Sequence, residues 1–387
     1  MILAERMSRL GTESAFEVLA KAKALEAQGK DIIHLEIGEP DFDTPKNIIK
    51  AAQKALDDGF THYNPAPGLP QLRQTIAEEM NKTRNIDVKL ENVVVVPGGK
   101  PTMFYAMLAL VNEGDEVIYP NPGFPIYESV INFLGAKAVP IPLREEKNFA
   151  FDVEEFASLI TDKTKMVIIN TPQNPTGGVL EKDDMQKIAN ILKDKDIWVL
   201  SDEIYDRIIY DNFEHTSITQ FEGMLEKTII LNGYSKTFAM TGWRLGYGIM
   251  PEPLAVQIAK LSINCHSCTA AFSQVAGIEA LKGPQDEVLA MVEEFRKRRD
   301  FFVDGLNSIK GITCIKPKGA FYVFPNITET GMTSKEIEKL LLEEAGIAAL
   351  AGSAFGKYGE GYLRFSYANS IENIDKALGR ISKILER

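Results

Sequence analysis

The chain has 387 residues, 45% of them hydrophobic and 25% charged, which suits a globular protein large enough for two domains. Its 43 basic and 54 acidic residues give a net charge of −11, with the acidic residues dispersed, which argues against a nucleic-acid partner. Three cysteines are too few for a disulfide framework, and no apolar run is long enough to cross a bilayer. We therefore expect a cytoplasmic protein without a membrane partner.

In the first third of the chain, patterns typical of helices alternate with short apolar runs typical of strands. Helix formers and stop signals predict helices over residues 15–28, 45–57 and 100–110, and apolar runs predict strands over residues 32–37, 92–96 and 117–119. A proline-rich loop at residues 61–68 contains Tyr63, which by itself is an ordinary loop aromatic. The alternation predicts an α/β fold with a mainly parallel central sheet.

Glycines follow two of these predicted strands. Gly38 allows close backbone approach to a ligand, although an ordinary turn would also explain it. Gly98 and Gly99 precede the helix that begins near Lys100, and the free amides of a helix N-terminus bind anions. Neither the Walker spacing nor the dinucleotide spacing is present, which counts against nucleoside triphosphates and NAD.

The middle third contains three further apolar runs, at residues 166–169, 198–200 and 228–231, each followed by polar residues. These residues are Asn174, the pair Asp202 and Tyr205, and Lys236, and ligands of α/β sheets gather at such strand ends. Arg244 follows Lys236 by eight positions. A buried amine beside a cation has a lowered pKa and can attack a carbonyl, while the arginine holds a phosphate. The alternative is a surface lysine and a structural arginine.

The last third begins with a long predicted helix over residues 287–306, followed by a predicted hairpin over 312–325 and a strand over 362–367. That strand carries Arg364 among apolar neighbours, so it needs a carboxylate partner, either a structural acid or a substrate. Cys265 and Cys268 have the spacing of a metal half-site, but no second pair exists. We therefore expect structural cysteines and no metal.

The stretch at residues 235–246, Ser-Lys-Thr-Phe-Ala-Met-Thr-Gly-Trp-Arg-Leu-Gly, resembles the lysine motif of the class I and II pyridoxal-phosphate aminotransferases of fold type I. Further matches follow in family order from residues 38–42 to residues 363–367, so the resemblance covers nearly the whole chain. It implies a large cofactor-binding domain over residues 45–281. The N-terminal segment, residues 1–44, would join residues 282–387 in a smaller α/β domain.

The resemblance also implies a role for each candidate residue. Lys236 would bind pyridoxal 5′-phosphate covalently and move protons, Asp202 would face the pyridine nitrogen, and Tyr205 and Asn174 would donate to the phenolic oxygen. Phe124 would stack on the ring, and the phosphate would lie near Gly98, Gly99, Lys100, Ser235 and Arg244. Tyr63 would reach the phosphate of a neighbouring subunit, which implies a homodimer. The substrate would contact Gly38, Asn174, Arg364 and Lys100, with Arg364 holding its α-carboxylate.

Lys100 leaves three interpretations open: a contact to the distal carboxylate of an acidic substrate, a phosphate contact, or a solvated side chain. Three departures from the better-known aspartate aminotransferase pattern bear on specificity. Gly233 stands where a phosphate-binding serine often occurs, Phe124 replaces the commoner tryptophan, and no arginine occurs in residues 262–272.

We expect an aminotransferase that moves an amino group between an amino acid and a 2-oxo acid by a ping-pong mechanism, favouring aspartate and 2-oxoglutarate. The alternatives on the same scaffold are an aromatic or alanine aminotransferase and a carbon–sulfur β-lyase. A cofactor-binding regulator without turnover is a further alternative, although no residues are left over for a DNA-binding module.

Overall fold

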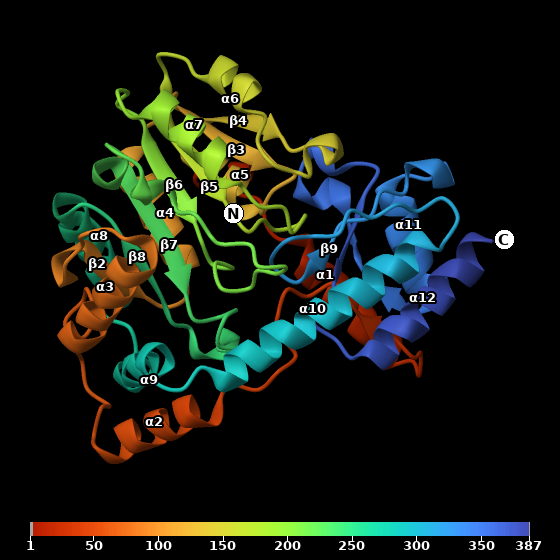
Figure 1. The fold of residues 1–387 in the computed structure, drawn as a ribbon, viewed down its shortest axis with the longest axis horizontal. Coiled ribbons are helices and arrows are strands. Elements are labelled where there is room, and N and C mark those ends of the chain that lie inside the picture. The colour runs from red at the N-terminus through yellow and green to blue at the C-terminus, as the bar shows by residue number, and fades with distance from the viewer. Residues whose placement is uncertain (1–2, 387) are drawn as a thin grey trace.

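The computed structural model describes residues 3–386, and a seven-stranded sheet forms its centre (Figure 1). The strands are β2 (Val93–Val96), β3 (Glu116–Asn121), β4 (Lys137–Pro142), β5 (Thr164–Asn170), β6 (Trp198–Asp202), β7 (Thr228–Gly233) and β8 (Gly246–Ile249). Their order across the sheet is β2-β8-β7-β6-β5-β3-β4, and β8 runs antiparallel to both of its neighbours while the other pairings are parallel. The predicted α/β fold with a mainly parallel sheet is confirmed.

Helices cover both faces of this sheet. One face is covered by α4 (Lys100–Leu110), α5 (Ile126–Phe133) and α8 (Glu252–His266). The other is covered by α6 (Val153–Leu159) and α7 (Lys182–Leu192), and towards β2 by α2 (Lys46–Asp57), α3 (Pro70–Arg84) and α9 (Ala271–Lys282). Along β3, Val117 and Tyr119 belong to the first cluster and Ile118 to the second. Because both faces are buried, most of these strands contain a short apolar run, and these runs made the strands predictable from the sequence.

The C-terminal third starts with the long helix α10 (Asp286–Asn307). It packs on a sheet of order β11-β12-β9, formed by β11 (Leu350–Ala351), β12 (Leu363–Ser366) and β9 (Tyr322–Val323), together with α11 (Ser334–Leu340) and α12 (Ile371–Leu385). The N-terminal helix α1 (Ser14–Glu26) is followed by β1 (Ile33–His34), which pairs in parallel with β10 (Ile347–Ala348). This pairing ties the start of the chain to its last third.

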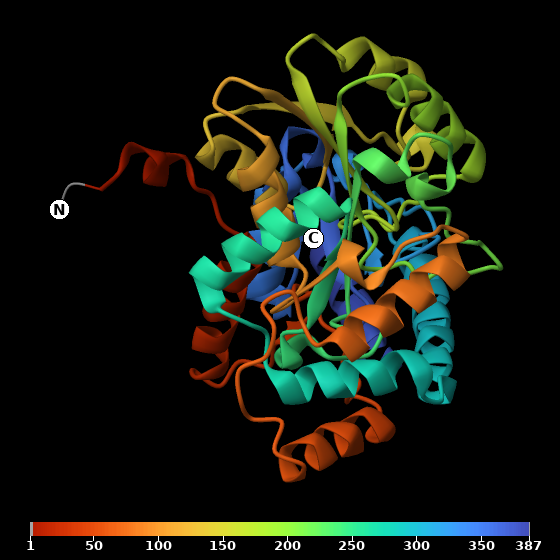
Figure 2. The ribbon, with the colours of Figure 1, turned by 90° about the vertical axis from the view of Figure 1, so that its left-hand side faces the viewer.

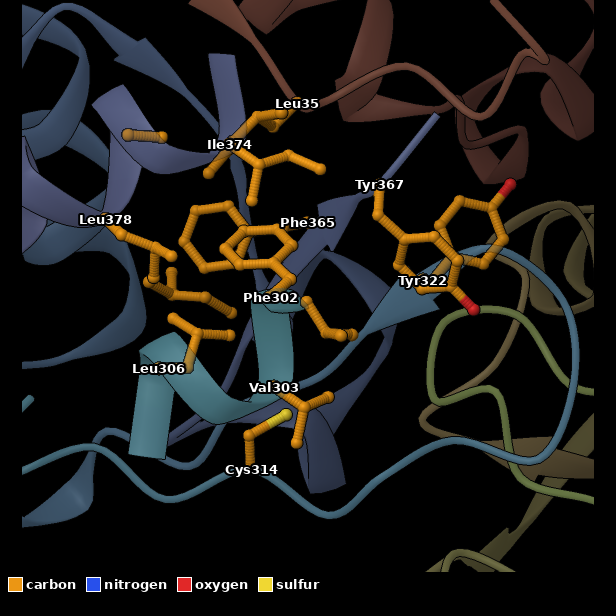
Figure 3. Packing of buried hydrophobic residues seen from close by; sticks show 14 of the residues in the cluster. Leu35, Phe302, Val303, Leu306, Cys314, Tyr322, Phe365, Tyr367, Ile374 and Leu378 are labelled. Atoms are coloured by element: carbon orange, nitrogen blue, oxygen red, sulfur yellow. The ribbon is translucent and has the colours of Figure 1, made fainter. Parts of the chain in front are cut away.

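Residues from both ends of the chain share one hydrophobic cluster (Figure 3). The rings of Phe302 from α10 and Phe365 from β12 have centroids 5.6 Å apart, and Leu35 from the N-terminal segment packs into the same cluster. Such sharing is what the proposed smaller domain requires. The predicted boundaries at residues 44/45 and 281/282 stay a prediction.

The structure shortens two predicted elements. The strand predicted over residues 32–37 forms a ladder only at Ile33–His34. The Leu35 amide still donates to Ala348 O of β10, but the Leu35 carbonyl accepts from the Ser366 amide of β12. The hairpin predicted over residues 312–325 is reduced to one antiparallel bridge between Thr313 and Asn326. In both segments, tertiary contacts take the backbone groups that a regular ladder would use.

The first described residues extend away from the body of the protein (Figure 2). They include a short helical turn at Glu5–Arg9 and three exposed apolar side chains, Leu3, Met7 and Leu10. No helix among residues 3–386 combines the length and the apolar character that crossing a membrane requires.

Candidate active site

A cavity of about 470 Å³ lies where β5, β6 and β7 end and α4 begins. The candidate residues that line it are Gly38, Gly99, Lys100, Phe124, Asn174, Asp202, Tyr205, Ser235, Lys236, Arg244 and Arg364. Two candidates lie outside the lining: Gly98, which is directly behind it, and Tyr63, whose side chain is 90% exposed. The structure therefore brings together residues from all three thirds of the sequence at the carboxyl edge of the sheet.

Lys236 follows β7 and points into this cavity. Its Nζ donates a hydrogen bond to the backbone carbonyl of Gly38, and it lies 5.9 Å from the centroid of the Phe321 ring. Burial lowers the pKa of the Lys236 amine to about 8, and the nearby Arg364 acts in the same direction while the Glu39 carboxylate opposes it. The lysine keeps some accessible surface because the cavity opens onto it. An amine with this pKa is partly neutral near pH 7 and can act as a nucleophile or a base.

Asp202 ends β6, and its carboxylate is buried without a cationic partner among the described residues. Its Oδ2 accepts a hydrogen bond from the Tyr127 hydroxyl at 2.6 Å, and its Oδ1 accepts one from the Ile204 amide at 3.2 Å. Burial raises the pKa of Asp202 to about 6, although both hydrogen bonds oppose the rise. A buried carboxylate held open to a cavity in this way is suited to a cationic ligand group.

Arg364 comes from β12 and is a buried cation without an ion pair in residues 3–386. Its Nη1 donates to Asn174 Oδ1 at 3.1 Å and its Nη2 donates to the Glu36 carbonyl, while its Nε has no hydrogen-bond partner. The guanidinium lies over the Tyr322 ring at 4.5 Å, and the Tyr322 hydroxyl is 2.7 Å from that of Tyr205. Of the two partners considered for Arg364, a structural acid is absent among residues 3–386, and this absence favours a ligand carboxylate.

Gly98 and Arg244 form the opposite, anion-binding end of the cavity. Gly98 has φ +85°, and a Cβ at this position would lie 2.2 Å from Arg244 Nη2, so only glycine leaves the guanidinium its place. Arg244 donates to the Thr241 carbonyl at 2.7 Å and has no ion pair among the described residues. Together with Ser235 and the first amides of α4, it forms a cradle of donors for a phosphate.

Lys100 and Phe124 lie at the cavity wall between these ends. The Lys100 ammonium is 5.3 Å from the Phe124 ring centroid and forms an ion pair with Glu13, while its side chain is 49% exposed. Phe124 packs edge-to-face on Tyr127 with centroids 5.5 Å apart. Of the three interpretations, a freely solvated lysine is thus the one that this geometry does not favour.

The family model described as "Aminotransferase class I and II" matches residues 30–381. The chain belongs to this aminotransferase family. The aspartate aminotransferase of Pyrococcus horikoshii is 44% identical over 99% of this chain and 97% of that protein. The aromatic-amino-acid aminotransferase 2 of Thermococcus litoralis is 39% identical over 100% and 99%. The crystal structure titled aspartate aminotransferase from Thermus thermophilus with maleate has a TM-score of 0.94 at 35% identity, covering 99% of this chain and 100% of that one.

The enzyme is thus a pyridoxal-5′-phosphate-dependent aminotransferase of fold type I, which acts on amino acids and 2-oxo acids. The site fits this cofactor. The buried Asp202 lacks a cation that a protonated pyridine nitrogen would supply, and the cradle at Gly98 and Arg244 lacks an anion that the phosphate would supply. Lys236, with its lowered pKa, lies in the same cavity and would hold the carbonyl carbon.

The departures noted in the sequence have local explanations in this aminotransferase. A Cβ at Gly233 would lie 3.1 Å from Gly246 Cα and 3.2 Å from the Leu245 carbonyl, so the close pairing of β7 with β8 favours glycine there. Residues 262–272, which contain no arginine, span the junction of α8 and α9 and do not line the cavity of their own chain. The three cysteines are free thiols.

Sequence reasoning missed several residues that shape this site. Tyr127 holds Asp202, Tyr322 underlies Arg364, and Glu13 pairs with Lys100. Tyr127 lies three residues after Phe124 in the same proline-rich stretch, so its position was a usable signal. Glu13 and Tyr322 carry no motif, and only the folded chain places them at the cavity.

Proposed function

We propose that this aminotransferase exchanges the amino group between aspartate and 2-oxoglutarate. The observation that supports this choice is the presence of both Arg364 and Lys100 in one cavity, in addition to the cation that serves the phosphate. A dicarboxylate would then meet a guanidinium at its α-carboxylate and an ammonium at its distal carboxylate. The relative from Pyrococcus horikoshii, named for aspartate, supports the same substrate.

Arg364 would orient the substrate, because its buried guanidinium has a free Nε and no acidic partner among the described residues. Burial lowers the pKa of Arg364, so an incoming carboxylate relieves part of the cost of its charge. Gly38 and Asn174 would border the same carboxylate, since Asn174 already shares a hydrogen bond with Arg364. Orientation of this kind supplies part of the rate by proximity, up to roughly 7–11 kcal/mol in general.

Lys236 would move the proton between the substrate Cα and the position to which the amino group is transferred. Its amine, with a pKa of about 8, is close enough to neutrality to accept and return a proton. When bound, the cofactor supplies a protonated ring that withdraws electrons from the deprotonated Cα. Asp202 would keep that ring nitrogen protonated, Tyr127 would hold Asp202, and Tyr205 would donate to the phenolic oxygen.

The phosphate would be bound by the amides of Gly99 and Lys100 with Ser235 and Arg244, and Phe124 would lie against the ring. Gly98 would contribute by leaving room for the guanidinium. We assign these roles together because all of these residues lie at or directly behind one cavity.

The proposal includes a homodimer in which Tyr63 reaches the neighbouring site. Its 90% exposed side chain and the projecting N-terminal segment with exposed Leu3, Met7 and Leu10 support such an association (Figure 2). The free thiols support a reducing, cytoplasmic compartment. The shared cluster around Phe302 and Leu35 supports a smaller domain made of both chain ends.

The experiment is a single-turnover spectrum of the loaded enzyme with aspartate, glutamate, alanine, phenylalanine and cystathionine, with identification of the products. Fast conversion by aspartate is expected, weakened in Lys100→Ala but not in Lys187→Ala, an exposed lysine that also has an ion pair. Lys236→Ala should lose the visible absorbance of the covalently bound cofactor. Preference for an apolar amino acid, or release of pyruvate and ammonia from cystathionine, would discard aspartate as the substrate.

A further inference from the structure

Lys100 stands at an electrostatically unfavourable place. It is the first residue of α4, where the helix dipole disfavours a positive charge, and its ammonium forms an ion pair with Glu13. Glu13 precedes α1, 87 positions earlier in the chain. The pair is therefore a contact between two elements that are distant in the sequence, at the wall of the cavity. The Glu13 carboxylate is already paired with the Lys100 ammonium, which the distal carboxylate of a dicarboxylate substrate would need.

Glu13 faces the inside of the cavity. Its side chain is only 18% exposed, and it lines the same cavity as Lys236 and Arg364. Its negative charge acts on both of these cations, raising the pKa of each against the effect of burial. The carboxylate thus belongs to the electrostatics of the site and not to the outer surface.

The wall around this pair is apolar. Phe16 lies in the first turn of α1, three positions after Glu13, and it lines the same cavity although it is 61% exposed. Ile37 and Met103 add apolar surface to the lining. With Lys100 and Glu13 paired, this end of the cavity carries no net charge and offers an apolar surface to a substrate side chain.

We propose that Glu13 is a specificity-determining residue that competes with the substrate's distal carboxylate for the Lys100 ammonium. While the pair is closed, the site takes amino acids with apolar side chains. When a dicarboxylate binds, its distal carboxylate replaces Glu13 on Lys100. This inference rests on the proposed role of Lys100, and it lets the single cavity accept an apolar amino acid in addition to the dicarboxylates aspartate and 2-oxoglutarate.

The size of the competition follows from the exposure of the pair. Ion pairs with one half-exposed partner are weak, and replacing such a competitor is expected to tighten dicarboxylate binding by about two- to five-fold. A monocarboxylate with an aromatic side chain does not need Lys100. Its affinity should therefore stay within about 1.5-fold.

The test measures equilibrium binding of two non-reacting acids, maleate and 3-phenylpropanoate, to the loaded enzyme through the change in its cofactor absorbance. The variants are Glu13→Gln, Lys100→Met and the double variant. Glu17→Gln is the matched control, because Glu17 is an exposed residue of the same helix outside the cavity lining.

Glu13→Gln should bind maleate about two- to five-fold more tightly, with the affinity for 3-phenylpropanoate nearly unchanged. Glu17→Gln should match the original enzyme. In the Lys100→Met background, Glu13→Gln should have no effect on maleate binding. Unchanged maleate binding in Glu13→Gln, or equal gains for both acids, would overturn the role of Glu13 while leaving the proposed function intact. Unchanged maleate binding in Lys100→Met would overturn both roles at this wall. Loss of the proposed function itself would appear separately, as the absence of turnover with aspartate in the unmodified enzyme.

Discussion

The buried carboxylate of Asp202 leads to a quantitative expectation for the cofactor-free protein. Its pKa rises from an ordinary value of 3.8 to about 6, so the ionised form is less favourable in the folded than in the unfolded chain. The pKa difference of about two units corresponds to roughly 3 kcal/mol of stability. This contribution is fully present only below about pH 4, where Asp202 is protonated in both states, and it is lost as the pH rises through about 6. At neutral pH, Asp202 therefore lowers the free energy of unfolding of the cofactor-free protein.

Asp202→Asn removes this charge but also one acceptor. The remaining side-chain oxygen can accept from either the Tyr127 hydroxyl or the Ile204 amide, and losing the other bond costs about 1 kcal/mol. The net expectation is a cofactor-free variant more stable by roughly 2 kcal/mol at about pH 7.5. The gain should shrink to below about 1 kcal/mol near pH 5, where the charge costs less.

Urea unfolding of the stripped protein at a fixed protein concentration measures both values. The control is Asp196→Asn, a side chain that is 94% exposed, which should change stability by less than about 0.5 kcal/mol at either pH. If Asp202→Asn is less stable than the original protein at pH 7.5, or its gain does not depend on pH, the assignment of Asp202 as an unpaired buried carboxylate is wrong. With cofactor bound, the order should reverse, because the ring cation then stabilises the aspartate.

Two further predictions concern residues next to this carboxylate and to the phosphate cradle. Tyr127→Phe removes a hydrogen bond that favours ionised Asp202, so the acidic limb of the pH profile of kcat/KM should move upward by about one unit; an unshifted limb would show that Asp202 does not set it. Gly98→Ala places a Cβ against Arg244 at a positive φ, so it should lower stability by about 1–3 kcal/mol and weaken cofactor binding in an equilibrium titration. Gly379→Ala, at a site with open space, should do neither.

The strands of the central sheet could be predicted because each is recognisable from a few consecutive residues. Both faces of the strands are buried, so Val93–Val96 and the run 229–231 within Thr228–Gly233 are apolar, and the polar residues that follow these runs must lie at one edge. Lys236 and Asp202 were found for this reason, with the resemblance adding their roles. The short strand β1 shows the limit, since the hydrogen bonds of Leu35 go to two different segments that only the folded chain brings together.

The residues that were missed act through contacts between distant parts of the chain. Glu13 reaches Lys100 across 87 positions, and Tyr322 reaches Tyr205 across 117. A single sequence carries no periodicity for such pairs, and in the sequence a glutamate just before a helix is explained by its favourable interaction with the helix dipole. Their function depends on where a cavity forms, which is a property of the packing and not of any local pattern.

Several charged side chains that line the cavity have no partner of opposite charge within the part of the protein that the structure describes. The lining contains the cations Lys100, Lys236, Arg244 and Arg364 and the carboxylates Glu13, Glu39 and Asp202. Glu13 has a protein cation, and Glu39 accepts a hydrogen bond from Thr241, but Asp202, Arg244 and Arg364 have no partner of opposite charge in residues 3–386. Asp202 and Arg364 are buried, and unpaired buried charges cost stability, so we expect a ligand of opposite charge at each: a ring cation for Asp202 and a carboxylate for Arg364. Arg244 is exposed, and its guanidinium is free for the proposed phosphate. A site that bound only an anion would need no Asp202. The increase in the free energy of unfolding of the cofactor-free protein caused by Asp202→Asn therefore measures the destabilisation by the Asp202 charge that cofactor binding must offset.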